Sequence, residues 1–194
     1  MTFKFALAAS AACLALAACN SSNGSSAALT SAEAQNVEAT YSDYADRIGT
    51  GDLTTTVPTG QASMSGYMGV SNVNPDDPTT TVMGELAMDV DFDAGTLTGK
   101  GSNFGIYSGD VLTKEADVTG SLDVAGTVSS SDMSATATGT MSDGSSAGAD
   151  FALDMTGSFY DDAGTLTAVG DISGTMTDGS DVQNVDGNYY ATEN

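Results

Sequence analysis

The stretch that decides the fold reads Gly84-Glu-Leu-Ala-Met-Asp-Val-Asp-Phe-Asp-Ala-Gly-Thr-Leu-Thr-Gly99. In its first half, from Leu86 to Phe92, apolar residues alternate with acidic residues and alanine. Because successive side chains of a strand point to opposite faces, this alternation predicts a strand with one apolar and one polar face. The segment Asp93-Ala94-Gly95 is typical of a tight turn, and Leu97 belongs to the next predicted strand. The stretch therefore predicts an antiparallel hairpin.

The same two-residue alternation recurs along most of the chain after Gly51. The predicted strands lie near residues 64–68, 85–92, 97, 122–128, 133–141, 150–159, 166–176 and 188–191. Turn signals separate them at Asp93-Ala94-Gly95, Asp143-Gly144, Asp162-Ala163-Gly164, Asp178-Gly179 and Asp186-Gly187. Hairpins in sequence order, with no helix between them, predict an all-β domain: an eight-stranded antiparallel up-and-down barrel, which leaves no strand edge exposed. A two-layer sandwich is the alternative fold.

One short repeated segment supports the prediction of a barrel built from hairpins. The segment Asp93-Ala-Gly-Thr-Leu-Thr98 recurs as Asp162-Ala-Gly-Thr-Leu-Thr167, and each copy follows an alternating strand. Two copies indicate two similar hairpins within one barrel, because a solenoid or a propeller needs more repeats.

Before the strands, residues 30–49 follow a helical spacing. Their apolar positions recur at intervals of three and four residues, namely at Ala34, Val37, Tyr41, Tyr44 and Ile48. Thr30 or Ser31 is the expected N-cap and Gly49 the expected terminator. We expect one N-terminal amphipathic helix that packs as a cap on the barrel domain of residues 52–194.

Residues 1–18 have the pattern of a secretory signal. A single lysine precedes an apolar run that is shorter than the roughly 20 residues a membrane-spanning helix needs. Leu16-Ala17-Ala18-Cys19 resembles the lipobox of bacterial lipoproteins, which implies cleavage before Cys19 and acylation of its thiol. Asn20 follows Cys19, and the resemblance implies that the protein is exported to the outer membrane. The sequence does not decide between its surface side and its periplasmic side. Residues 19–29 are predicted to form a flexible lipidated tether.

Charge and cysteine content narrow the function. After cleavage, three basic residues face 26 acidic ones, a formal charge of −23, which excludes nucleic acid as a partner. Cys19 is then the only cysteine, so no disulfide is expected. Histidine is absent, and with it the commonest general base. A pair of carboxylates is the remaining catalytic arrangement, but solvated strand faces explain the acids more simply. We expect no enzyme activity and no cofactor.

Two patterns suggest ligands. Asp89, Asp91 and Asp93, followed by Gly95, resemble part of a calcium loop, although turn chemistry accounts for Asp93 and Gly95 more directly. Seven methionines lie on the apolar side of the predicted strands: Met64, Met68, Met88, Met133, Met141, Met155 and Met176. Such a lining suits haem, but methionine more often fills gaps between strands, and we expect a narrow, filled interior.

The stretch from Gly84 to Gly99, together with Gly157-Ser-Phe-Tyr160 and Gly164-Thr-Leu-Thr-Ala-Val-Gly170, resembles the barrel domain of transferrin-binding-protein-B-like lipoproteins. The resemblance covers roughly residues 60–192. It implies an eight-stranded barrel with a lipid anchor on the outer membrane that binds a host iron protein, haem or another solute. This chain has one barrel and short loops, whereas the transferrin receptors have two lobes. Transferrin binding itself and ligand-contacting residues are therefore not transferred.

Three functions follow as hypotheses. The first is an outer-membrane-anchored binding module for a protein, haem, iron or another solute. The second is a structural or interaction lipoprotein of the envelope without a small ligand. The third is a small transmembrane barrel, which the lipobox and the absence of aromatic girdles oppose.

Overall fold

The computed structural model describes residues 27–144 and 148–194. The predicted signal peptide, Cys19 and most of the predicted tether lie outside the described residues. The elements are α1 (Ser31–Thr50), β1 (Thr54–Thr55), β2 (Gln61–Ser71), β3 (Thr81–Asp91), β4 (Thr96–Ser108), β5 (Thr113–Asp117), β6 (Thr119–Gly120), β7 (Leu122–Ser129), β8 (Asp132–Ser142), β9 (Ala149–Asp162), β10 (Thr165–Asp178) and β11 (Asp181–Glu193).

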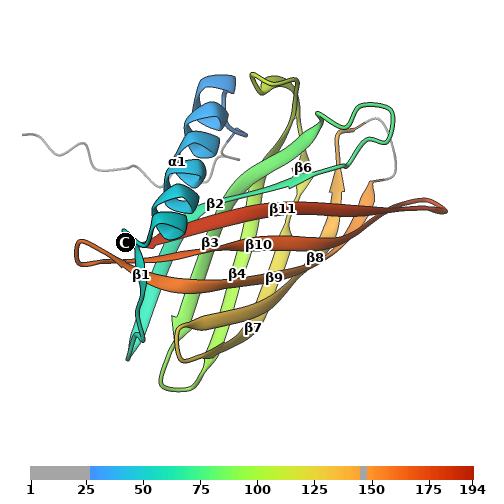
Figure 1. The fold of residues 1–194 in the computed structure, drawn as a ribbon. Coiled ribbons are helices and arrows are strands. Elements are labelled where there is room, and N and C mark those ends of the chain that lie inside the picture. The colour runs from blue at the N-terminus through green and yellow to red at the C-terminus, as the bar shows by residue number, and fades with distance from the viewer. Residues whose placement is uncertain (1–26, 145–147) are drawn as a thin grey trace, which may run out of the picture.

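Eight of the strands form a closed antiparallel barrel (Figure 1). Neighbours pair in the order β2, β3, β4, β7, β8, β9, β10 and β11, and β11 pairs with β2 to close the ring. The short strands β1, β5 and β6 extend the ring at β9, β4 and β8. The predicted all-β barrel with one helix is confirmed, and the sandwich alternative is wrong.

The hairpin predicted from residues 84–99 is formed by β3 and β4. Val90 pairs with Leu97 across this hairpin. In the hairpin of the repeated segment, between β9 and β10, Asp162 pairs with Thr165. One predicted turn is wrong, because Asp186-Gly187 lies within β11, where Gly187 pairs with Ile172. A Cβ at Gly187 would collide with the carbonyl oxygen of Gly69, so this glycine serves close strand packing and not a turn.

The barrel interior is packed with the inward-facing apolar side chains. All seven predicted methionines are buried in one core cluster with leucine, valine and phenylalanine. Tyr189 spans from β11 across β10, and its hydroxyl lies against Gly157 and Gly170. That hydroxyl has no hydrogen-bond partner among the described residues, and burial raises its pKa well above the ordinary tyrosine value. The expected filled interior is therefore what the structure has.

Helix α1 lies against the outside of the barrel (Figure 1). A second apolar cluster joins its buried face to outward side chains of the strands: Ala34 and Val37 on the helix, and Met83, Tyr160, Val169 and Tyr190 on the wall. Thr30 is the N-cap and forms a capping box with Glu33. The helix passes the expected end at Gly49, because Gly51, not Gly49, adopts the left-handed conformation that ends it.

The outward face of the strands carries acidic groups that bond to neutral partners. Ser63 donates to Asp89 at 2.6 Å, and Asn103 donates to Glu85 at 2.6 Å. The two basic residues with ion pairs in the described part of the chain are Arg47 and Lys114. Most of the acidic charge is consequently balanced by solvent ions, and its self-repulsion opposes compaction.

Replacing Gly157 with alanine is expected to destabilise the barrel by about 1–3 kcal/mol, because the new methyl group would overlap the Val169 carbonyl and the Tyr189 hydroxyl. Gly69→Ala is the matched control. A Cβ there would meet only Met83 Cε at 3.6 Å and Thr81 Cγ2 at 3.9 Å, ordinary contacts. Urea unfolding measures both, and equal stabilities of the two variants would contradict the packing described for Gly157.

Salt is expected to stabilise the fold. The melting temperature should rise by about 5 °C between low salt and 0.5 M sodium chloride, because screening weakens repulsion among the acidic residues. Calorimetry checks this, and most of the gain should come before about 0.5 M, where the Debye length is already only a few ångströms. A melting temperature that is flat in this range would show that the acidic groups do not repel one another appreciably.

Candidate functional site

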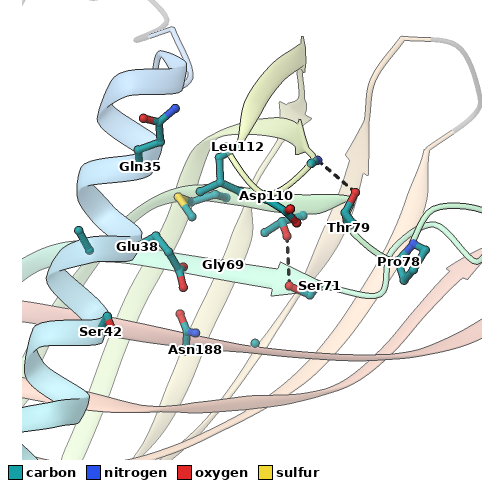
Figure 2. A pocket seen from close by; sticks show the side chains of 15 residues that line it. Gln35, Glu38, Ser42, Gly69, Ser71, Pro78, Thr79, Asp110, Leu112 and Asn188 are labelled. Carbon is teal, nitrogen blue, oxygen red and sulfur yellow. Dashed lines mark hydrogen bonds between the residues drawn. The ribbon is translucent and has the colours of Figure 1, made fainter.

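A groove lies outside the barrel, beside the N-terminal half of α1 (Figure 2). Its volume is about 630 Å³. One wall is the helix, where Gln35, Glu38, Ala39 and Ser42 face the groove. The floor and far wall come from β2, β3, β11, the β2–β3 connection and the β4–β5 turn, so the groove exists only because the helix docks on the barrel.

Hydrogen bonds connect the elements that form the walls of the groove. The hydroxyls of Ser71 and Thr81 lie 3.1 Å apart across β2 and β3. The backbone N–H of Gly109 donates to Thr79 Oγ1 at 3.1 Å, and both bonds are drawn in Figure 2. Gln35 Nε2 donates to the Val111 carbonyl at 2.5 Å and ties the helix to the β4–β5 turn. The groove is thus framed by bonded elements.

The electrostatics of the groove are acidic. Glu38 and Asp110 line opposite walls, and neither carboxylate forms an ion pair with a described residue. No lysine or arginine is among the lining residues. Met83 and Leu112 add an apolar part to the floor. The groove combines negative charge, hydroxyl and amide groups, and a small apolar surface.

A second concavity of about 540 Å³ continues along the C-terminal half of the helix. It is bordered by Tyr41, Ala45 and Ile48 and by strands β8, β9 and β10, and Asp132 and Asp171 contribute negative charge. The Tyr41 hydroxyl donates to Asp171 at 3.4 Å. Burial raises the pKa of Tyr41, and the nearby Asp171 charge raises it further. We call the groove and this second concavity together the helix tract.

The helix is held in place at its C-terminal end by Arg47. Its guanidinium donates two hydrogen bonds to Asp162, at 2.5 and 3.1 Å, and lies 5.8 Å from the ring centre of Tyr44. Tyr44 in turn packs on Tyr190, with ring centres 5.5 Å apart. Burial raises the pKa of Tyr190 to about 12, so it remains neutral at physiological pH.

At the other end, the residues before the helix are fastened to β4 and β5. The Tyr107 hydroxyl donates to the Leu29 carbonyl at 2.7 Å, and Lys114 Nζ donates to the Ala28 carbonyl at 2.9 Å. Lys114 also pairs with Asp117 at 2.7 Å. Ala28 and Leu29 are both buried, so these residues before the helix also belong to the packed domain.

Each end of the barrel has a small concavity. Phe92 and Phe159 pack edge to face at 5.0 Å near one end, beside a concavity of about 240 Å³. At the other end lies a pit of about 300 Å³, whose lining combines apolar residues such as Val82, Met141 and Phe151 with polar ones such as Thr80 and Asp178. The pit has about half the volume of the groove, which makes it the weaker candidate for a binding site.

The calcium candidates are occupied by hydrogen bonds. Asp89 accepts from Ser63, Asp91 accepts from Gln61 and from the backbone of Ala94, and Asp93 accepts from the Gly60 N–H. The bond from the backbone N–H of Ala94, and after it the bond from Gln61, lower the pKa of Asp91. Among residues 27–144 and 148–194, no group of three or more metal-ligating side chains is placed to hold an ion.

No protein-family model matches the chain, and no curated protein matches it. The described part of the chain contains no helix with the length and apolarity needed to cross a membrane.

The pair of Arg47 and Asp162 predicts a pH dependence. Arg47 lowers the pKa of Asp162 below its ordinary value of 3.8, so the pair stabilises the fold above that pH and is lost as the pH falls through the lowered pKa. Asp162→Asn should therefore lower the melting temperature at pH 7, and the difference from the wild type should shrink toward zero below about pH 3.

Asp154→Asn is the control for this experiment, because Asp154 is exposed on β9 and has no ion pair among the described residues. Thermal unfolding followed by circular dichroism from pH 7 to acid measures both variants. A deficit of Asp162→Asn that stays constant over this range would contradict a charge-based role.

Proposed function

We propose that this chain is an outer-membrane-anchored lipoprotein whose barrel is a binding module, and that the module contacts its partner on the outer wall beside α1. The proposal rests on the lipobox-like segment that ends at Cys19 for the anchor and on the groove beside α1 for the binding surface. The resemblance to transferrin-binding-protein-B-like lipoproteins is part of the same proposal, and neither comparison names that family.

The observation that carries the binding surface is the filled interior. The methionine side chains that suit haem in the sequence pattern are packed against one another and against the rings of Phe104, Phe151 and Phe159. A flat ligand of haem size has no space there without displacing core side chains. This packing favours a partner on the outside, where the groove of about 630 Å³ lies.

The distribution of polar groups supports a barrel that stands outside the bilayer. The inward positions of the strands are apolar, and the outward positions carry serine, threonine and aspartate. Membrane-spanning barrels have the reverse arrangement, with an apolar band facing lipid and polar groups facing the lumen.

The filled interior also favours the second candidate, an envelope lipoprotein that assembles with other components and holds no small ligand. Both candidates use the outer wall. They differ in the partner: a ligand that is captured and released, or a stable component of the envelope.

The anchor is tested by labelling cells that express the full chain with radioactive palmitate. The wild type should be labelled and sediment with the outer membrane. Cys19→Ser should lose the label and no longer sediment with the outer membrane, because Cys19 is the only cysteine left after the predicted cleavage. A Cys19→Ser variant that keeps both the label and the membrane location would overturn the anchor.

The binding surface is tested in the same cells with a photo-crosslinking residue at Ser42, in the groove, or at Asp154, on the wall away from the helix. An adduct from position 42 and none from position 154 is the expected result. Equal adducts from both positions, or none from 42, would oppose a binding surface beside α1.

A further inference from the structure

We infer that the helix tract binds an extended peptide segment that carries lysine or arginine, presented by a partner protein. This inference deepens the proposed function by naming the chemistry of the partner. It rests on the shape of the tract, on its charge and on the use that the fold makes of its own cations.

The shape of the tract suits an extended chain. The groove borders helix residues 35–42 and the second concavity borders residues 41–49, so the two follow one another along α1. Fifteen helical residues span about 22 Å, the length of about seven residues of extended chain. A compact solute would occupy only one of the two concavities.

The charge of the tract selects a cationic occupant. Glu38 and Asp110 face the groove, and Asp132 and Asp171 face the second concavity. No lysine or arginine lines either one. The whole chain has a formal charge of −22, and a field of this sign draws in cationic partners and repels acidic ones.

The basic residues in the described part of the chain lie outside the lining of the helix tract. Arg47 bonds to Asp162 and Asp43, and Lys114 bonds to Asp117 and to the Ala28 carbonyl. Lys100 lies on β4 and does not line the tract. The carboxylates of Glu38 and Asp110 consequently have no counterion among residues 27–144 and 148–194, and a partner's ammonium or guanidinium groups are complementary to them.

The remaining lining suits a long basic side chain and an extended backbone. Met83 and Leu112 offer an apolar floor for the methylene stem of lysine, whose charged head then stays near the carboxylates. Ser42 and Asn188 provide hydrogen-bonding groups along the same groove. A second copy of this chain is a poor occupant, because two surfaces of the same strong charge repel each other.

The test measures binding of the full chain, in detergent, to a fluorescent peptide that alternates lysine and serine and is long enough to span the tract. Anisotropy is recorded at about 0.15 M salt, where long-range attraction is largely screened. A glutamate-for-lysine peptide and spermidine are the comparison ligands. We expect the lysine peptide to bind, the glutamate peptide not to bind, and spermidine to bind at least about tenfold more weakly.

Two matched double variants locate the site. Glu38→Gln with Asp110→Asn should weaken binding of the lysine peptide about tenfold, because two facing carboxylates are lost. Asp154→Asn with Asp181→Asn removes the same charge from exposed positions on β9 and β11 that line neither concavity, and should change binding less than twofold. A third variant, Ala39→Phe, fills the groove without a change of charge and should also weaken binding.

Each result of these measurements either supports or overturns the inference. Equal losses in the two double variants would mean that the peptide is held by the general charge of the surface, which overturns the inference. Absence of binding, or equal binding of spermidine, would overturn the extended cationic segment as the occupant. If the crosslink at position 42 persists in cells while the lysine peptide fails to bind, the proposed binding module stands and only its ligand class falls.

Discussion

The structure depends on one constraint: eight strands in which apolar and polar residues largely alternate must close around an interior that their own side chains fill. Closure fixes the interior width, so bulky inward residues need small ones opposite them. Tyr189 shows this, because its ring crosses β10 and its hydroxyl rests where Gly157 and Gly170 have no side chains. The flexible methionines fill the irregular spaces that remain. The described interior is therefore filled except for the pit of about 300 Å³ at one end of the barrel.

The same alternation that fills the interior makes the outer wall polar, except for one apolar area that includes Tyr67, Val169 and Tyr190. Helix α1 covers this area, which explains why a strand-built domain begins with a helix. A convex helix on a convex wall touches it along a narrow strip, and the surfaces diverge beside that strip. The helix tract is this divergence, lined by the polar flank of the helix and by small residues such as Gly69. The candidate site is therefore a geometric consequence of the cap.

The fold could be predicted from the sequence to this extent because the two-residue period is local and repeats in all eight barrel strands. The errors occurred where a local signal has a nonlocal cause. Asp186-Gly187 has the composition of a turn. The glycine is needed there because a side chain at Gly187 would collide with the backbone of Gly69 on the neighbouring strand. The site could not be predicted for the same reason. Glu38 and Asp110 are 72 residues apart in the sequence and line the same groove only because the helix docks beside the β4–β5 turn. No motif marks either residue.

The few basic residues explain how the cap and the acidic surface belong together. Arg47 fastens the end of the helix to Asp162, and Lys114, which also pairs with Asp117 within β5, fastens Ala28 before the helix to β5. Both side chains attach the N-terminal segment to the strands. Because they do not neutralise the carboxylates beside the helix, that surface stays acidic. Under the proposed lipid anchor, the residues between Cys19 and Ala28 span at most about 30 Å, which keeps the helix tract within that reach of the membrane plus the size of the domain. A membrane-proximal partner with an exposed basic segment would therefore meet the tract without having to release the cap.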